Sequence, residues 1–177
     1  GDVAIGFPPV DAADAGDGAK RATQPMAIVK SCLKWTAPIH AGEVAFLKDR
    51  SDAVVKITLP GPCTLHFRGG TDEILRYGAY EDIDAFWDDI VEAYAQEFAS
   101  LVDAGCRYVQ IDETAFAKFG DPAVRQTLAD RGDHWETLID EYVGIINRVL
   151  ARAPAALNIG MHLCRGNRGG HFHAEGG

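Results

Sequence analysis

Two long amphipathic segments, each followed closely by a short apolar segment, constrain the fold of this chain more than any other feature. Residues 83–102 carry apolar side chains at helical spacing, and residues 107–111 then have the composition of a strand. The same order recurs in residues 133–152 and 157–163. Helix and strand alternating in this way predict a parallel sheet with right-handed crossovers.

The first half of the chain has a similar order of segments. Residues 27–33 and 53–59 are predicted as strands, and residues 40–50 between them as a short helix. The predicted strands are apolar without alternation, so we expect both of their faces to be covered, either by helices or because a barrel wraps them. Four strands cannot close a (β/α)8 barrel, which needs about 250 residues. The predicted fold class is therefore α/β: a (β/α)8 TIM barrel, present only as a partial barrel of about four βα units.

Composition divides the chain into two regions and limits its partners. Residues 1–26 are rich in Gly, Ala, Asp and Pro and are predicted to be irregular, whereas residues 27–177 form the partial barrel. A net charge of -9 argues against a nucleic-acid surface. No leader and no apolar run of about 18 residues is visible, which predicts no membrane partner. Four cysteines without a C-x-x-C pair fit reduced thiols, so we expect a cytoplasmic protein.

His162 and Cys164 are the candidate metal ligands. They lie two residues apart at the end of the last predicted strand, so both side chains point to one face. Imidazole and thiolate are preferred zinc ligands, although a core cysteine beside a hydrogen-bonded histidine would give the same pattern. A closed structural site that adds His171 and His173 is a further alternative.

Two other predicted loops carry polar side chains after a strand. Asp112 and Gln110 share a face by the period of two, and a carboxylate there could bind a substrate amine or act as a base. A second carboxylate, Glu113, stands beside Asp112, which favours function over a capping role. The loop of residues 60–70 offers Thr64, His66 and Arg68, and Arg68 suits a carboxylate or phosphate.

Three motifs resemble, in order and spacing, those of the cobalamin-independent methionine synthase family. They are Gly61-Pro62-Cys63-Thr64-Leu65, Gln110-Ile111-Asp112-Glu113-Thr114 and Met161-His162-Leu163-Cys164. The resemblance covers residues 28–177 and is greatest to the short, single-barrel members. It implies a (β/α)8 barrel and a zinc-dependent enzyme of methionine biosynthesis that transfers a methyl group to a thiol such as homocysteine. The donor would be 5-methyltetrahydrofolate or another methyl donor.

The resemblance also implies roles for single residues. His162 and Cys164 match the first two zinc ligands, and Asp112 matches the acidic residue that holds the amino group of homocysteine. The family's other zinc ligands and its catalytic acid would fall beyond Gly177, so no catalytic residue is expected within this chain. His66 and the two residues that follow it stand where the long synthases have a tryptophan. This difference argues against a folate donor more than it argues against the zinc-thiol chemistry.

Three hypotheses follow for the function of the whole protein. The first is the zinc-dependent methyltransferase, with a small thiol and a methyl donor as partners and a possible homo-oligomer. The second is a barrel relative of the decarboxylase or coenzyme-thiol alkyltransferase type, in which Arg68 and Arg165 would recognise a polyacid or sulfonate. The third is a non-catalytic barrel fragment that needs a partner to cover its exposed strand edges.

Overall fold

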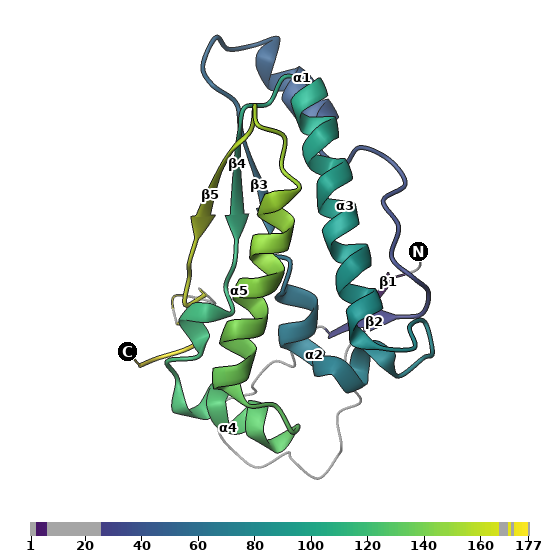
Figure 1. Cartoon of the computed structure of the whole chain (residues 1–177). Helices are drawn as coiled ribbons and strands as arrows, with labels where there is room; N and C mark the ends of the chain where they lie inside the picture. Colours follow the sequence, from purple (N-terminus) through teal and green to yellow (C-terminus); the bar gives the residue numbers. More distant parts are fainter. Residues whose placement is uncertain (1–2, 7–25, 167–169, 171, 177) are drawn as a thin grey trace.

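A three-stranded parallel sheet organises the fold (Figure 1). The computed structural model describes residues 3–6, 26–166, 170 and 172–176. The strands are β3 (Lys56–Pro60), β4 (Tyr108–Asp112) and β5 (Asn158–His162), in the order β3-β4-β5. The α/β class with parallel strands is confirmed. Closure into a barrel is not present among the described residues, and the sheet has three strands where the sequence predicted four.

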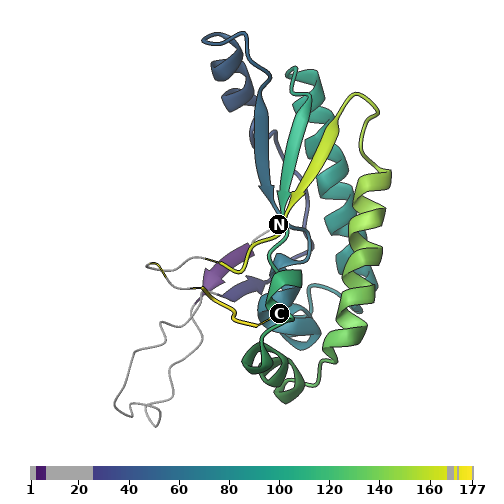
Figure 2. The same cartoon turned by 90° about the vertical axis from the view of Figure 1, so that its left-hand side faces the viewer.

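Helices connect these strands and lie mainly on one side of the sheet. They are α1 (Ala41–Lys48), α2 (Thr64–Leu75), α3 (Ile83–Asp103), the 3-10 turn η1 (Phe116–Lys118), α4 (Pro122–Asp130) and α5 (Trp135–Ala151). Figures 1 and 2 show α3 and α5 side by side against one face of the sheet, while the opposite face has no helix over it. None of the helices in the described part of the chain is long and apolar enough to cross a membrane.

The two faces of the sheet differ in chemistry, which corrects the expectation that both are covered. Ile57, Val109 and Ile111 face the helices and are buried. Lys56 and Gln110 belong to the opposite face, where side chains are exposed or half-buried. Apolar and polar residues therefore alternate along β3 and β4, as expected of strands covered on one side only.

The predicted first strand belongs to a separate hairpin. β2 (Met26–Val29) pairs antiparallel with β1 (Val3–Gly6) and does not join the parallel sheet. The prediction of an irregular segment over residues 1–26 is therefore wrong for residues 3–6, and residues 7–25 lie outside the described part. A short apolar run gives a strand but not its partner, so the sequence could not distinguish the two arrangements.

The two long helices confirm the predictions made from periodicity. Along α3, Phe86, Phe98 and Leu101 are fully buried, and the side chain of the N-cap residue Asp82 accepts a hydrogen bond from the Ala85 N–H (2.9 Å). The buried residues of α5 are Leu138, Tyr142, Ile145, Ile146 and Val149.

A buried carboxylate on α3 attaches the segment before α1 to the rest of the fold. Glu97 is 3% exposed and accepts hydrogen bonds from the Trp35 indole (2.8 Å) and from the backbone N–H groups of Ile39 (3.0 Å) and His40 (3.1 Å). Three donors compensate for the loss of water around the carboxylate. Glu97 therefore fixes the connection that leads from β2 into α1.

We expect Glu97→Ala to lower the free energy of unfolding by about 3 kcal/mol, because it leaves three buried donors without an acceptor. Chemical denaturation followed by circular dichroism measures this loss. The control is Glu92→Gln on the same helix, where the exposed Glu92 pairs with Gln96 and Arg152 at the surface. Equal denaturation midpoints for the two variants would show that Glu97 does not hold this segment.

Candidate functional site

The register of the sheet brings two predicted site residues together. Asp112 on β4 is the direct partner of His162 on β5, and both belong to the face that no helix covers (Figure 2). Backbone hydrogen bonds extend this pairing past the strand ends, from Gly61 N–H to Asp112 O (2.9 Å) and from Glu113 N–H to His162 O (3.0 Å). A carboxylate and an imidazole therefore lie side by side on neighbouring strands at the carboxyl edge of the sheet, where α/β proteins bind ligands.

Cys164 lies in a turn just beyond β5. Its Sγ accepts a hydrogen bond from the Gly166 N–H (3.3 Å), and the thiol is half-buried. The end of the chain folds back onto this turn, since the His173 N–H donates to Arg165 O (2.9 Å) and Ala174 is 1% exposed. Cys164 is thus held close to the carboxyl edge of β5, in a turn with fixed backbone contacts.

The described residues do not by themselves complete a zinc site. No group of three or more His, Cys, Asp or Glu side chains suited to a metal occurs among them. His162 and Cys164 have the right chemistry for two ligands, but tetrahedral coordination requires about four. The closed set with His171 and His173 is not tested, because His171 lies outside the described residues.

Gln110 and Asp112 share a face of β4, as the period of two predicted. The Gln110 amide Nε2 donates to Asp112 Oδ1 (2.7 Å), and the Lys56 ammonium donates to Gln110 Oε1 (2.9 Å). Lys56 was not identified from the sequence as a site residue. Its position on β3, on the same face as Gln110 of the neighbouring strand, would have identified it, but that position is known only once the register of the sheet is known.

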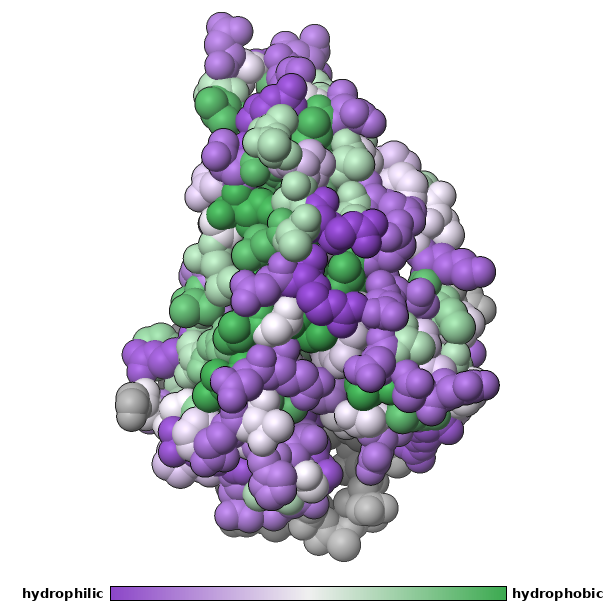
Figure 3. Space-filling model, in the orientation of Figure 1, coloured by the Kyte–Doolittle hydropathy of each residue, from purple (hydrophilic) through white to green (hydrophobic). Residues whose placement is uncertain are grey.

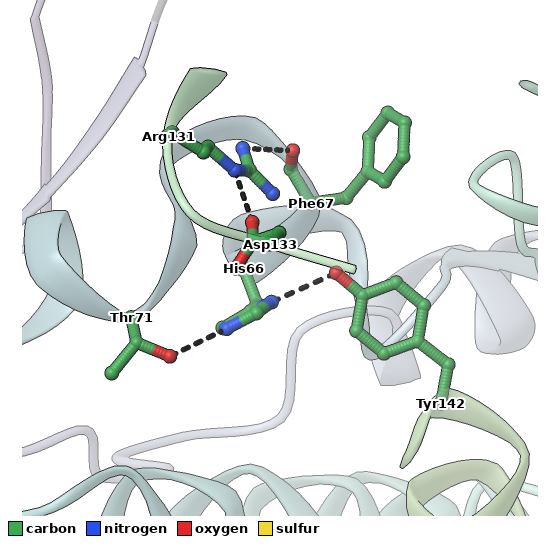
Figure 4. Close-up of polar contacts among 6 residues, drawn as sticks. All are labelled: His66, Phe67, Thr71, Arg131, Asp133 and Tyr142. Carbon is green, nitrogen blue, oxygen red and sulfur yellow. Dashed lines mark hydrogen bonds and ion pairs between the residues drawn. The ribbon is translucent and has the colours of Figure 1, made fainter. Parts of the chain in front are cut away.

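The prediction that Thr64, His66 and Arg68 lie in a loop is wrong. They lie in the first turns of α2, whose backbone is kinked at Gly70 (φ +75°). His66 is 1% exposed, with Nδ1 2.8 Å from the Tyr142 hydroxyl and Nε2 3.0 Å from the Thr71 hydroxyl (Figure 4). Both ring nitrogens are engaged inside the protein, so His66 does not face a ligand.

Arg68 is exposed and lies near a half-buried cation that the sequence analysis missed. Lys118, in η1, donates to the Thr114 hydroxyl (3.3 Å) and stacks 5.1 Å from the centre of the Phe67 ring. Burial and the charge of Arg68 lower the pKa of Lys118, while Glu113 and Cys164 act in the opposite direction. Lys118 therefore lies beside Phe67, the residue that precedes Arg68, and these two cations would attract an anionic ligand.

Glu113 does not join Asp112 on the open face. It is completely buried, and its carboxylate accepts hydrogen bonds from the backbone N–H groups of Cys63 (3.3 Å) and Ala115 (3.1 Å). Burial raises the pKa of Glu113, and these two N–H donors oppose the shift. A side chain at position 61 would collide with the Glu113 carboxylate, which explains Gly61. Glu113 thus links the loops after β3 and β4 and orders the edge of the site.

His66 makes the stability of the fold dependent on pH. Its pKa is lowered to about 4 by burial, with the Arg131 charge adding to the shift and Asp133 opposing it. An unfolded His66 titrates near 6.5, so below that pH the unfolded state takes up the proton first. The neutral, buried His66 therefore contributes fully to the free energy of unfolding above about pH 6.5, and this contribution is lost as the pH falls towards about 4.

We expect wild-type protein to lose roughly 2 kcal/mol of unfolding free energy through His66 between about pH 7 and about pH 5. His66→Gln keeps a polar side chain but does not titrate, so its unfolding free energy should fall by that much less over the same range. Urea denaturation at both pH values measures the difference. Parallel pH profiles for the two proteins would contradict a buried, neutral His66.

The sequence matches a family model over most of its length. The model described as "Cobalamin-independent synthase, Catalytic domain" matches residues 19–173. Two uncharacterized proteins of Bacillus subtilis (strain 168) are similar. YxjH is 34% identical over 146 residues, covering 82% of this chain and 38% of YxjH, and YxjG is 35% identical over 153 residues, covering 82% and 39%.

Two solved structures are also similar. A protein of Listeria monocytogenes, provisionally described as a vitamin-B12-independent methionine synthase, superimposes with a TM-score of 0.64 at 32% identity, over 79% of this chain and 41% of that one. The B12-independent methionine synthase of Shewanella sp. W3-18-1, solved in complex with selenomethionine, has a TM-score of 0.55 at 20% identity, over 82% and 36%. That second likeness supports the fold alone.

This chain therefore spans about two fifths of the length of these relatives. The family-model match and the relatives above 30% identity agree with the three sequence motifs at the carboxyl edge of the sheet. The chain belongs to the cobalamin-independent synthase family and corresponds to part of its catalytic domain.

Proposed function

We propose that this chain is part of a zinc-dependent methyltransferase of methionine biosynthesis, which transfers a methyl group to a thiol such as homocysteine. The observation that carries the proposal is the pairing of Asp112 with His162, followed by Cys164, at the carboxyl edge of the sheet. In a member of this family, that pairing would set an acceptor for a substrate ammonium beside candidate zinc ligands. The donor would be 5-methyltetrahydrofolate or another methyl donor.

We propose further that the sheet is part of a (β/α)8 barrel. The polar face without helices would then be the barrel interior, and further βα units would pair with β3 and β5. Apolar side chains on the outer flank support this, since Val143 and Leu150 of α5 and Met161 of β5 are 44%, 37% and 44% exposed. Figure 3 shows hydrophobic surface on this side of the molecule, over α5 and the region of β5. A neighbouring unit would bury it.

Each candidate site residue would have a distinct role in binding. Asp112 would accept a hydrogen bond from the substrate ammonium, and His162 and Cys164 would hold zinc together with ligands from outside the described residues. Bound zinc would lower the pKa of the substrate thiol and so supply a thiolate near neutral pH. Arg68 and Lys118 would contribute positive charge near that position, where a substrate carboxylate could bind.

The second candidate is a barrel relative of the decarboxylase or coenzyme-thiol alkyltransferase type. The placement of Lys118 beside Phe67, the residue that precedes Arg68, favours it, because two cations at one edge suit a polyacid or a sulfonate better than a single carboxylate. Small-molecule partners, a cytoplasmic location and a possible homo-oligomer belong to both candidates as expectations.

A methyl-transfer assay tests the first candidate, using the chain extended to the length of its relatives, with homocysteine and 5-methyltetrahydrofolate. We expect Asp112→Asn to raise the KM for homocysteine at least about tenfold, because the ammonium loses a charged acceptor. Cys164→Ser should remove both activity and bound zinc. The matched control is Cys32→Ser, since Cys32 is an exposed cysteine whose thiol donates to Ala79 O.

Full activity in Cys164→Ser would contradict the zinc-thiol proposal. Turnover of a sulfonate or polyacid in place of homocysteine, lost on Arg68→Met, would select the second candidate.

A further inference from the structure

The open face of the sheet carries two successive hydrogen bonds that end at Asp112. The Lys56 ammonium on β3 donates to Gln110 Oε1 (2.9 Å), and Gln110 Nε2 on β4 donates to Asp112 Oδ1 (2.7 Å). Lys56 pairs with Tyr108 in the register, so its side chain reaches one row towards the carboxyl edge to meet Gln110. The three side chains therefore form a line across two strands that leads to the candidate ligand position.

The charges at the two ends of this line fix the amide of Gln110 in one orientation. With the amide reversed, its NH2 group would face the Lys56 ammonium and its carbonyl would face the Asp112 carboxylate, and both contacts would be repulsive. In the observed orientation, both are charge-assisted hydrogen bonds, which are the stronger kind. Gln110 is thus restrained by two opposite charges, one from each strand.

This arrangement changes the role expected of Gln110, which the sequence predicted beside Asp112 as a candidate substrate-binding residue. Its carbonyl accepts from Lys56 and its amide donates to Asp112, so both of its polar ends are engaged. One oxygen of Asp112 is engaged as well, whereas its Oδ2 accepts no hydrogen bond from the described residues. A cationic group that arrives at this row would meet Asp112 Oδ2 as its acceptor, and Gln110 would not contact it through its carbonyl.

We infer that Lys56 and Gln110 are positioning residues, which orient the Asp112 carboxylate so that one oxygen faces the ammonium of an amino-acid ligand. This inference rests on the proposed function for the identity of the ligand. It assigns the direction of the Asp112 carboxylate to a lysine one strand away. An N-acylated ligand would lack the ammonium from which Asp112 Oδ2 would accept a hydrogen bond.

NMR of the chain in its present length tests the arrangement directly, through the side-chain NH2 signals of Gln110. In the wild type we expect these two protons to be well separated and shifted from the positions of a solvated glutamine, because one of them is held by Asp112. Lys56→Met and Asp112→Asn should each move both signals towards the solvated positions. Lys56→Arg should largely restore them. The matched control, Lys34→Met, removes the charge of an exposed lysine of another segment and should leave them unchanged.

Binding of homocysteine tests the consequence, measured by calorimetry on the same variants of the chain extended to the length of its relatives. We expect Lys56→Met and Gln110→Met to raise its Kd about tenfold, equivalent to one charge-assisted hydrogen bond, and N-acetylhomocysteine to bind more weakly than homocysteine. Gln110 signals at solvated positions in the wild type, or signals that ignore both Lys56→Met and Asp112→Asn, would overturn the inference. If the wild type shows the shifted signals but binds no homocysteine, the proposed function fails and the positioning arrangement stands.

Discussion

The parallel register of β3, β4 and β5 is the constraint on which the rest of this structure depends. Backbone hydrogen bonds align the ends of the strands, and because side chains alternate, one shift by a single residue would move Asp112 and His162 to the helix side. The helices hold this register through the opposite face, where Val109 and Ile111 are completely buried against α3 and α5. The chemistry of the open face therefore depends on apolar packing behind it.

Buried polar groups then fix the loops around the strands. Glu113 binds backbone N–H groups of the loops that follow β3 and β4, and His66 joins α2 to α5 through Tyr142. Each of these side chains makes its contacts inside the protein, in a place where the sequence suggested contact with a ligand. A burial of this kind costs little when hydrogen bonds replace water, and it makes the carboxyl edge of the sheet rigid. Rigid support is what a metal or substrate site requires of its surroundings.

How much of this could be predicted differs between local and long-range features. The helices α3 and α5 follow from apolar spacing alone, and the shared face of Gln110 and Asp112 follows from the period of a strand. The helix α2 was predicted as a loop because the pair Gly69-Gly70 is typical of loops. The helix accommodates this pair with a kink at Gly70. The burial of His66 depends on Tyr142, 76 positions away, and the contact of Lys56 with Gln110 depends on strand order. Sequence reasoning has no access to such pairings before the fold is known.

Zinc K-edge X-ray absorption tests the central claim most directly, which is that the carboxyl edge of β5 is a metal site. The sample is the chain extended to the length of its relatives, with one equivalent of zinc. We expect sulfur at about 2.3 Å and nitrogen at about 2.0 Å from the metal, with one sulfur neighbour fewer in Cys164→Ser. Coordination without sulfur, or a sulfur shell that is unchanged in Cys164→Ser, would place the metal elsewhere and contradict the claim.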